Sequence, residues 1–315
     1  MARVVPYGLV EPARHTPGVA VEAVASRSLD KARSFASTQA IPRTFGSYAE
    51  LLEDPDIDAV YVALPNALNA LWVRRALEAG KHVLCEKPLT ADAGVAEALM
   101  TCARRNDRVL HEAMHVRYLP KLRRLRELVT GGDFGALRGV ESCLRLPRIP
   151  MADGDFRLQY ELGGGAGLDL GCYAASCLRY IGGEEPEVIS ARHRRIAPEV
   201  DRWMRAVLRF PSGARGVLEC GFRGWYRKRM VIGATCERGR IELDEDGVAW
   251  RKNGRTGRES IAHGWTYQLQ IDAFARSVRG EDSAAPPPDD AVGNARVLGA
   301  MYAAAGLAPR PTIEG

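Results

Sequence analysis

A lysine placed between a glutamate and a proline, at the end of a short apolar run, is the most chemically suggestive feature of the chain. Residues 82–85 lead directly into Glu86, Lys87 and Pro88. Only six of the 44 basic residues are lysine, so this one stands out against arginine. An ammonium can transfer a proton, whereas a guanidinium keeps its own. Because proline fixes its own φ and favours an extended residue before it, the pattern predicts a rigid turn that directs Lys87 toward a ligand. A solvated lysine in a surface turn is the alternative.

A second candidate site follows a glycine-rich segment, residues 163–171. Asp169 and Tyr173 are four residues apart and share one face of the helix expected over 166–181. A phenol beside a carboxylate suits the recognition of a hydroxyl group and the transfer of its proton. Arg157, just upstream, is a weaker candidate for contacting a substrate. A glycine-rich packing loop with a capping aspartate is the alternative.

Two further strand ends carry candidate ligand groups. Ser26 and Arg27 follow the first expected strand, where an NAD-specific dinucleotide fold carries an acidic residue. A hydroxyl and a guanidinium suit a 2′-phosphate instead, so they predict NADP, with NAD the less favoured cofactor. Leu64, Pro65 and Asn66 end another expected strand and could place backbone groups near a ribose. A solvated loop at Ser26 and Arg27 is the alternative.

The elements that must position these residues change character along the chain. Apolar strands are expected at 19–25, 41–45, 58–64 and 82–85, and helices at 30–37, 48–52, 68–79 and 93–105. This alternation predicts a parallel sheet covered on both faces. Later strands are expected at 138–146, 187–195, 203–210, 214–222, 228–236, 239–243 and 247–252, with helices at 166–181, 265–279 and 289–305. We therefore predict an α/β protein with a Rossmann-type, doubly wound parallel sheet in residues 1–118. An α+β domain with a large, mostly antiparallel open sheet is expected in residues 119–315.

Composition narrows the function classes. The 315 residues are 46% hydrophobic and 26% charged, with a net charge of +5 that is scattered along the chain rather than clustered. This argues against a nucleic-acid surface. The seven cysteines form no C-x-x-C pair, which indicates free thiols in a reducing compartment and no metal site. No apolar run is long enough to span a membrane, so we expect a soluble, cytoplasmic protein.

Several of these segments together resemble a known family. They are residues 24–27, 48–52, 58–66, 80–88, the glycine-rich segment through Tyr173, and residues 289–305. In combination they resemble the glucose–fructose oxidoreductase/inositol dehydrogenase (Gfo/Idh/MocA) family. The resemblance is strongest to the branch of dihydrodiol dehydrogenases and NADP-linked sugar dehydrogenases. It covers the chain from about residue 9.

The resemblance implies a nicotinamide dinucleotide in the first domain and a sugar, polyol or cyclic diol against the sheet of the second. It implies that Lys87 contacts both nicotinamide and substrate, with Glu86 beside the cofactor. Tyr173 occupies the position of the general acid/base in this branch. Asp169 would hold a neighbouring hydroxyl group.

Departures from the family pattern lead to a second hypothesis. The family opens with a strand and a Gly-x-Gly-x-x-(Gly/Ala) loop, whereas this sequence begins within that loop, at Met1. Backbone N–H groups of Arg3 and Val4, and a helix over 7–14, could still face a phosphate. Loss of a central strand would leave two neighbours with unpaired edges, so we expect weak cofactor binding by residues 1–315. The alternative function is therefore a non-catalytic, truncated homologue, or a gene whose start is set too late.

Two single residues depart from the family pattern, and the second sheet predicts an assembly. Asn69 stands where relatives usually carry histidine, and Leu119 precedes Pro120 where many have histidine, which leaves the substrate class open. A homodimer is expected because one face of the second sheet needs a cover. The apolar residues proposed for that interface are Val217, Phe222, Trp225 and Trp250.

Overall fold

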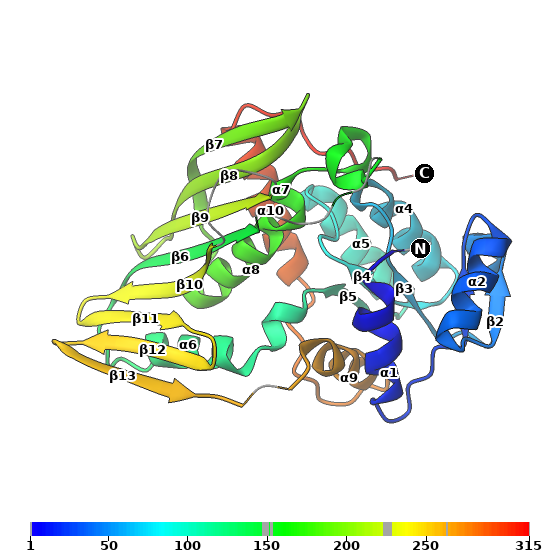
Figure 1. Ribbon diagram of the computed structural model, residues 1–315, viewed down its shortest axis with the longest axis horizontal. Helices are drawn as coiled ribbons and strands as arrows, with labels where there is room; N and C mark the ends of the chain where they lie inside the picture. The colour runs from blue at the N-terminus through cyan, green and yellow to red at the C-terminus, as the bar shows by residue number, and fades with distance from the viewer. Residues whose placement is uncertain (1, 147–150, 152–153, 223–228, 263, 315) are drawn as a thin grey trace.

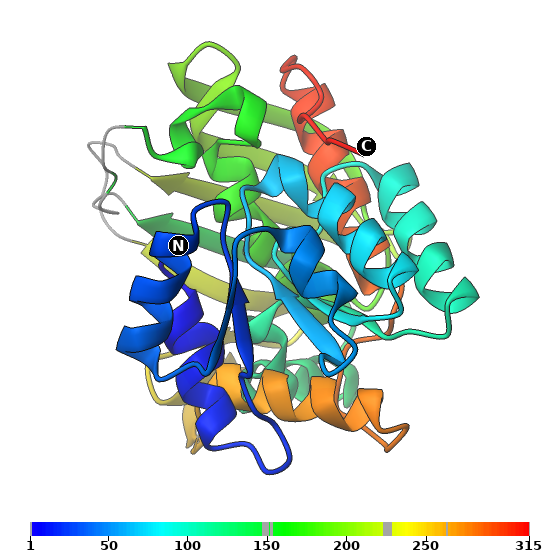
Figure 2. The same ribbon diagram turned by 90° about the vertical axis from the view of Figure 1, so that its right-hand side faces the viewer.

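The computed structural model describes residues 2–146, 151, 154–222, 229–262 and 264–314. They form two regions, a parallel α/β part and a larger part built on one wide sheet (Figures 1 and 2). The elements of the first are η1 (Pro6–Val10), α1 (Glu11–Arg14), β1 (Ala23–Ala25), α2 (Leu29–Gln39), β2 (Arg43–Phe45), α3 (Tyr48–Glu53), β3 (Ala59–Val62), η2 (Asn66–Leu68), α4 (Asn69–Glu78), β4 (His82–Glu86), α5 (Ala93–Arg105), β5 (Leu110–Ala113) and η3 (His115–Tyr118).

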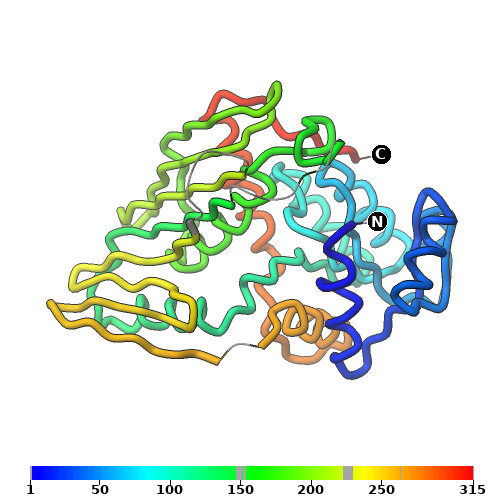
Figure 3. Tube along the Cα trace, viewed as in Figure 1, coloured from blue at the N-terminus to red at the C-terminus, as the bar shows by residue number. Residues whose placement is uncertain are grey.

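The strands of the first region form two parallel sheets rather than one. β1 pairs with β2, and β3–β4–β5 form a separate three-stranded sheet. Helices α4 and α5 cover one face of β4, where Val83 and Cys85 are buried. The other face, at Leu84, is covered by α9 (Thr266–Val278) from far along the chain, which lies beside α1 (Figure 3). The first region therefore depends on a C-terminal helix for part of its core.

The second region is an eight-stranded mixed sheet with helices packed on one face. Its elements are α6 (Pro120–Thr130), β6 (Leu137–Leu146), η4 (Phe156–Leu158), η5 (Tyr160–Leu162), α7 (Ala166–Asp169), α8 (Gly171–Gly182), β7 (Glu187–Ala197), β8 (Val200–Arg209), β9 (Arg215–Phe222), β10 (Arg229–Cys236), β11 (Gly239–Leu243), β12 (Gly247–Lys252), β13 (Arg255–Ser260), α9 and α10 (Asp290–Ala304). The strand order is β13-β12-β11-β10-β6-β9-β8-β7, antiparallel except for β6 beside β9. Its core lies between the sheet and helices such as α8, where Leu178, Met204 and Leu218 are fully buried.

The predicted fold class is confirmed, and the division at residue 118 stays a prediction. The C-terminal helix α10 contacts both regions, since it packs on α5 of the first as well as on β7 and α8 of the second. Among the described residues, no helix is long and apolar enough to cross a membrane. That part of the chain also contains no group of three or more histidine, cysteine or acidic residues arranged to hold a metal ion.

Local predictions differ from the structure in several elements. The strand expected over 19–25 is confined to Ala23–Ala25, and the sequence patterns missed β5, α6 and β13. The single helix expected over 166–181 is two, since α7 ends at Asp169 and α8 begins at Gly171. Gly165, the residue before α7, must be glycine: its φ is 123°, and a side chain there would collide with the Asp201 carboxylate.

The structure removes one of the apolar residues proposed for a dimer interface, because Phe222 is fully buried in the core of the same chain. Trp250 is partly buried and packs edge-on against Phe134 at the margin of that core, with ring centroids 6.1 Å apart. Val217 is half-buried, and its part in an interface stays a prediction. Trp225 lies outside the described residues. The homodimer itself stays a prediction.

Candidate active site

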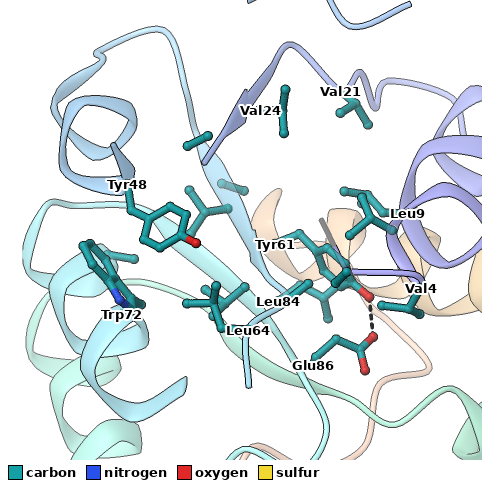
Figure 4. Close-up of a pocket in the computed structure, with 18 of the residues that line it drawn as sticks. Val4, Leu9, Val21, Val24, Tyr48, Tyr61, Leu64, Trp72, Leu84 and Glu86 are labelled. Atoms are coloured by element: carbon teal, nitrogen blue, oxygen red, sulfur yellow. Dashed lines mark hydrogen bonds between the residues drawn. The ribbon is translucent and has the colours of Figure 1, made fainter. Parts of the chain in front are cut away.

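One cavity of about 1580 Å³ lies between the two regions. Residues of β1, β3 and β4 line it together with residues of α7, α8 and α9. Figure 4 shows several of the lining side chains of the first region. Every candidate residue chosen from sequence lines this cavity: Arg3, Val4, Ser26, Arg27, Leu64, Pro65, Asn66, Glu86, Lys87, Arg157, Asp169 and Tyr173. Segments up to 170 residues apart in sequence are thus brought to one place. The roles assigned to the individual residues stay predictions.

Lys87 is held by an aspartate from the glycine-rich segment. Its Nζ donates to the backbone oxygen of Asp169 at 2.8 Å and to Oδ1 of the same residue at 3.1 Å. Both side chains are largely buried, at 11% and 10% exposure. Nζ also lies over the ring of Tyr173, 4.6 Å from its centroid. The turn after β4 therefore directs the ammonium to the second region, as the Glu-Lys-Pro pattern indicates.

Asp169 joins Lys87 to Arg157. Arg157 Nε donates to Asp169 Oδ2 at 2.9 Å, while its Nη1 lies 3.2 Å from Asp155 Oδ1. Because α7 ends at Asp169, this residue and Tyr173 do not share one helix face, contrary to the sequence expectation. They approach Lys87 from two successive helices instead.

Burial and charge set the protonation states of this cluster. Burial works to raise the pKa of Asp169, but Lys87 and Arg157 hold it below its ordinary value, so the carboxylate is ionised. Burial works to lower the pKa of Lys87, yet Tyr173 and Asp169, as anions, outweigh it and the pKa is raised well above its ordinary value. At neutral pH the pair is an ammonium and a carboxylate.

Tyr173 is a protonated phenol in this environment. Burial raises its pKa well above the ordinary value, and Lys87 opposes that rise only in part. The Lys87 ammonium favours the phenolate, but burial has the larger effect on the pKa of Tyr173. A neutral phenol next to a fixed cation can donate a proton to an oxygen that gains negative charge.

Two aromatic residues of the site were missed by sequence reasoning. His115 stacks on Tyr267 with ring centroids 4.3 Å apart and meets Tyr173 edge-on at 5.4 Å. Its Nδ1 lies 3.0 Å from the Thr266 hydroxyl. Burial, aided by Lys87, lowers the pKa of His115 to about 4, so its ring is neutral. No local pattern identifies this group, because Tyr173, Thr266 and Tyr267 are all distant from His115 in sequence.

The carboxylate before Lys87 has its own partner. Tyr61, on β3, donates its hydroxyl to Glu86 Oε1 (Figure 4). The backbone N–H of Lys87 donates to Glu86 Oε2 at 3.3 Å. Burial raises the pKa of Glu86, and Lys87 and the Tyr61 hydroxyl oppose that effect. Tyr61 is a third residue that the sequence patterns did not select.

Two asparagines form hydrogen bonds that support the turn around Lys87 and the contact between the two regions. Asn69, the first residue of α4, donates its amide to the Pro88 oxygen at 3.0 Å and the Glu86 oxygen at 3.3 Å. It therefore supports the backbone around Lys87 from behind. Asn66 donates to the Gly163 oxygen at 3.0 Å and so links the end of β3 to the glycine-rich segment. Leu119 packs against the core of the second region and does not line the cavity.

The far end of the cavity carries the hydroxyl and cationic groups that the sequence predicts for the adenosine ribose, and that role stays a prediction. Ser26 follows β1, and its hydroxyl accepts the N–H of Ser28, the residue that caps α2. Arg27 is exposed there, and Lys31, one helical turn on, also lines the cavity. A dinucleotide fits the residues present, with cationic and hydroxyl groups at one end and Lys87 at the other. A group bound at this strand-end edge is the usual arrangement of a doubly wound sheet.

The fold and this cavity define a two-domain oxidoreductase that binds a nicotinamide dinucleotide. Residues 8–114 match the oxidoreductase family with the NAD-binding Rossmann fold, and residues 122–242 match the GFO/IDH/MocA C-terminal domain. The chain belongs to the Gfo/Idh/MocA oxidoreductase family.

Named relatives are similar over most of their length. An NADP-dependent D-xylose 1-dehydrogenase of Haloferax volcanii is 34% identical over 290 residues, 90% of this chain and 89% of that protein. A trans-1,2-dihydrobenzene-1,2-diol dehydrogenase of Xenopus tropicalis is 33% identical over 251 residues, which are 77% of this chain and 73% of that protein. A 3-ketoreductase of Actinomadura kijaniata, solved with NADP and TDP-benzene, superposes with a TM-score of 0.88 at 28% identity, covering 96% and 95% of the two chains.

Proposed function

We propose that this protein is an NADP-dependent dehydrogenase acting on a carbinol of a sugar, polyol or cyclic diol. The observation that carries the proposal is the placement of Lys87, Asp169 and Tyr173 in one wall of the cavity whose other end presents Ser26 and Arg27. The NADP-dependent xylose dehydrogenase and the dihydrodiol dehydrogenase support the substrate class and the cofactor. Bound nicotinamide would supply or accept the hydride at C4.

The residues of this chain account for the proton. In the reducing direction the O–H bond of Tyr173 breaks and its proton passes to the carbonyl oxygen, while the hydride reaches the carbonyl carbon. The products are a carbinol and a phenolate, and the Lys87 ammonium stabilises the phenolate. Oxidation is the reverse, in which the phenolate takes the hydroxyl proton. Asp169, ionised and held by Arg157, accepts a hydrogen bond from a neighbouring substrate hydroxyl.

The test is turnover of NADP with a panel of aldoses, polyols and cyclic diols, after cofactor binding has been measured by calorimetry. We expect oxidation of at least one of them, with appearance of the reduced nicotinamide. Lack of turnover by a protein that demonstrably binds NADP would overturn the proposal and favour the non-catalytic homologue.

A further inference from the structure

The helix that carries Asp169 is too short to hold its own position. α7 has four residues, about one turn, and its first backbone hydrogen bond runs from the Asp169 N–H to the Gly165 oxygen at 3.1 Å. A single helical turn is marginal by itself, and the first N–H groups of a helix have no partner within it. Groups from other elements must therefore fix α7 in place.

Two buried side chains from distant elements cap this turn. Asp201, at the start of β8, accepts the N–H of Gly167 on Oδ2 at 2.8 Å, and the hydroxyl of Tyr302, on α10, accepts the N–H of Leu168 at 3.1 Å. The Tyr302 hydroxyl in turn donates to Asp201 Oδ1 at 2.9 Å. Asp201 and Tyr302 are 0% and 1% exposed. We call these two residues the α7 anchor.

The anchor requires a carboxylate at position 201. Three donors meet there, the N–H groups of Gly167 and Leu168 and the hydroxyl of Tyr302, and three oxygens accept them. An asparagine has nearly the same shape, but it replaces one acceptor by an NH₂ group with two further donors. Since the site is buried, at least one donor then stays without an acceptor.

Arg310 supports the anchor from behind. Its guanidinium carbon lies 4.2 Å from the centroid of the Tyr302 ring and 4.7 Å from that of Tyr160. Nη1 donates to the backbone oxygen of Glu199 at 2.5 Å, in the turn that leads into β8 and Asp201. The Arg310 side chain is 1% exposed, and cation–π contacts are stronger when desolvated. Both anchor residues are thus tied to one buried cation.

The other end of α7 carries the groups that hold Lys87. Asp169 accepts hydrogen bonds from Lys87 Nζ on its backbone oxygen as well as on Oδ1. Because one acceptor belongs to the main chain, a shift of α7 moves it directly, and a new rotamer of Asp169 does not restore that contact. The position of Lys87 over the Tyr173 ring therefore depends on where α7 is held.

We propose that Asp201 and Tyr302 are positioning residues of the candidate active site, which hold α7 so that Asp169 meets Lys87. Neither of these two residues lines the cavity, so they act through α7 rather than on a bound molecule. The effect of the anchor on turnover rests on the proposed function, whereas its effect on Lys87 does not.

The chemical reactivity of Lys87 tests the proposal without any catalysis. An acylating reagent such as N-hydroxysuccinimidyl acetate attacks the neutral amine, and burial together with the Asp169 carboxylate suppresses that reaction. Mass spectrometry resolves the six lysines of the chain. Lys81, 7% exposed and with Nζ 2.6 Å from the Asp54 oxygen, is the internal reference for opening of the first region.

Asp201→Asn and Tyr302→Phe are the test variants. We expect the ratio of Lys87 to Lys81 acetylation to rise by about tenfold or more in each, because a fall of one in the pKa of Lys87 makes its neutral amine tenfold more abundant. An unchanged ratio in both variants would overturn the proposal.

Val248→Ala is the matched control for lost stability. Val248 is fully buried on β12, across β11, β10, β6 and β9 from β8, so the cavity left by its truncation does not touch α7. The acetylation ratio of this variant should equal that of the wild type. A rise of equal size in the control, or a parallel rise of Lys81 and Lys87 in the anchor variants, would assign the effect to general opening and overturn the proposal.

Steady-state kinetics connect the anchor to the proposed reaction. In both anchor variants kcat should fall by about 10–100-fold, as for a slight misplacement of catalytic groups, while the KM for NADP stays the same. Adding Tyr302→Phe to Asp169→Asn should cost little more, since the anchor acts through Asp169. Full turnover despite a raised acetylation ratio would overturn the positioning role. A wild type without turnover would instead reject the proposed function, and the acetylation ratio would still decide whether the anchor positions Lys87.

Discussion

The ammonium of Lys87 lies over the face of the Tyr173 ring and gives its hydrogen bonds to Asp169. The lysine is thus fixed by the carboxylate and acts on the tyrosine through charge, at 4.6 Å from the ring centroid, rather than through a hydrogen bond to the hydroxyl. Since Asp169 stays ionised and Lys87 stays protonated, the cation is present over the whole neutral pH range. The first predictions follow from this arrangement.

Replacing Lys87 by methionine keeps an unbranched side chain, one heavy atom shorter, and removes the charge. We expect turnover to fall by ~10²–10⁴-fold, the usual range for acid–base assistance. Lys121→Met is the matched control, because Lys121 contacts backbone oxygens of Asp244 and Glu245, remote from the cavity. Steady-state kinetics of both variants check the prediction; equal losses would show that the effect is not specific to the site.

Tyr173→Phe removes the proton donor and leaves the ring beneath Lys87. A comparable loss of turnover is expected with nearly unchanged cofactor affinity. The double variant with Lys87→Met should be little worse than either single one if the pair acts as a unit. Additive losses would instead assign the proton to another group, with Asp169 the next candidate.

The raised pKa of Tyr173 sets the sign of the pH dependence. Reduction needs the phenol and should be lost as pH rises through the pKa of Tyr173, whereas oxidation needs the phenolate and should increase with pH. Lys87→Met should move both alkaline limbs to higher pH, because the cation that stabilises the phenolate is gone. Profiles of kcat/KM in both directions measure this; limbs that do not move would remove Lys87 from that role.

Arg27→Asp should shift the cofactor preference from NADP toward NAD. The change deletes a cation for the 2′-phosphate, adds repulsion, and supplies a carboxylate for the ribose hydroxyls. Arg33→Asp is the control, since Arg33 is exposed on α2, the helix that follows Arg27, and does not line the cavity. Binding of both cofactors by calorimetry decides; an unchanged ratio would place Arg27 away from the ribose.

Asn69→Ala removes the amide that bonds the oxygens of Glu86 and Pro88. Two partly or fully buried acceptors lose their donor, so the free energy of unfolding should fall by about 1–3 kcal/mol. Turnover should fall as well, because the backbone around Lys87 loses its support. Denaturant unfolding and kinetics check this, with Asn106→Ala, whose amide bonds the Cys102 oxygen, as the control. Lower stability with full turnover would limit Asn69 to a structural role.

Glu112 should make the protein less stable as pH rises from 4.5 to about 7. Burial raises its pKa from 4.5 to about 7, while Oε1 accepts the Leu89 N–H at 2.8 Å. A raised folded pKa contributes stability that is complete below 4.5 and is lost as pH rises through 7. Glu112→Gln keeps the acceptor and cannot ionise, so its unfolding free energy relative to the wild type should rise between pH 5 and 8, by at most about 3 kcal/mol. A constant difference across that range would contradict the prediction.

His111 and His115 change the stability with pH in the opposite direction to Glu112. Burial lowers the pKa of His111 and His115 to about 4, so the unfolded chain binds more protons between pH 4 and 6.5, and stability should fall as pH is lowered through that window. In the wild type this loss is offset in part by Glu112. The Glu112→Gln variant should therefore show the acid-side loss more steeply, which the same unfolding series measures.

Local patterns sufficed where neighbouring residues decide the structure. The helices expected at 30–37, 68–79 and 93–105 are present, because their spacing and their caps, Ser28 for α2 and Asp92 for α5, depend on interactions within one turn. They failed at β5 and α6, and at the junction of α7 with α8. There the helix is interrupted at Leu170, beside a glycine segment whose conformation depends on Asp201, more than thirty residues away.

The sequence by itself determined which groups could do chemistry. Residue type and order at Glu86, Lys87 and Pro88, and at Ser26 and Arg27, predict a directed ammonium and a phosphate-binding end, whereas dehydrogenase activity is what the resemblance to the family implies. The tertiary structure decided how these groups act together. It brought Asp169 into hydrogen-bond contact with Lys87, 82 residues away in sequence, and it buried Tyr173 as a neutral phenol. It also held the sheets of β1 and β3 apart. Pairing, desolvation and charge interactions between distant segments depend on distances that no short stretch of sequence encodes.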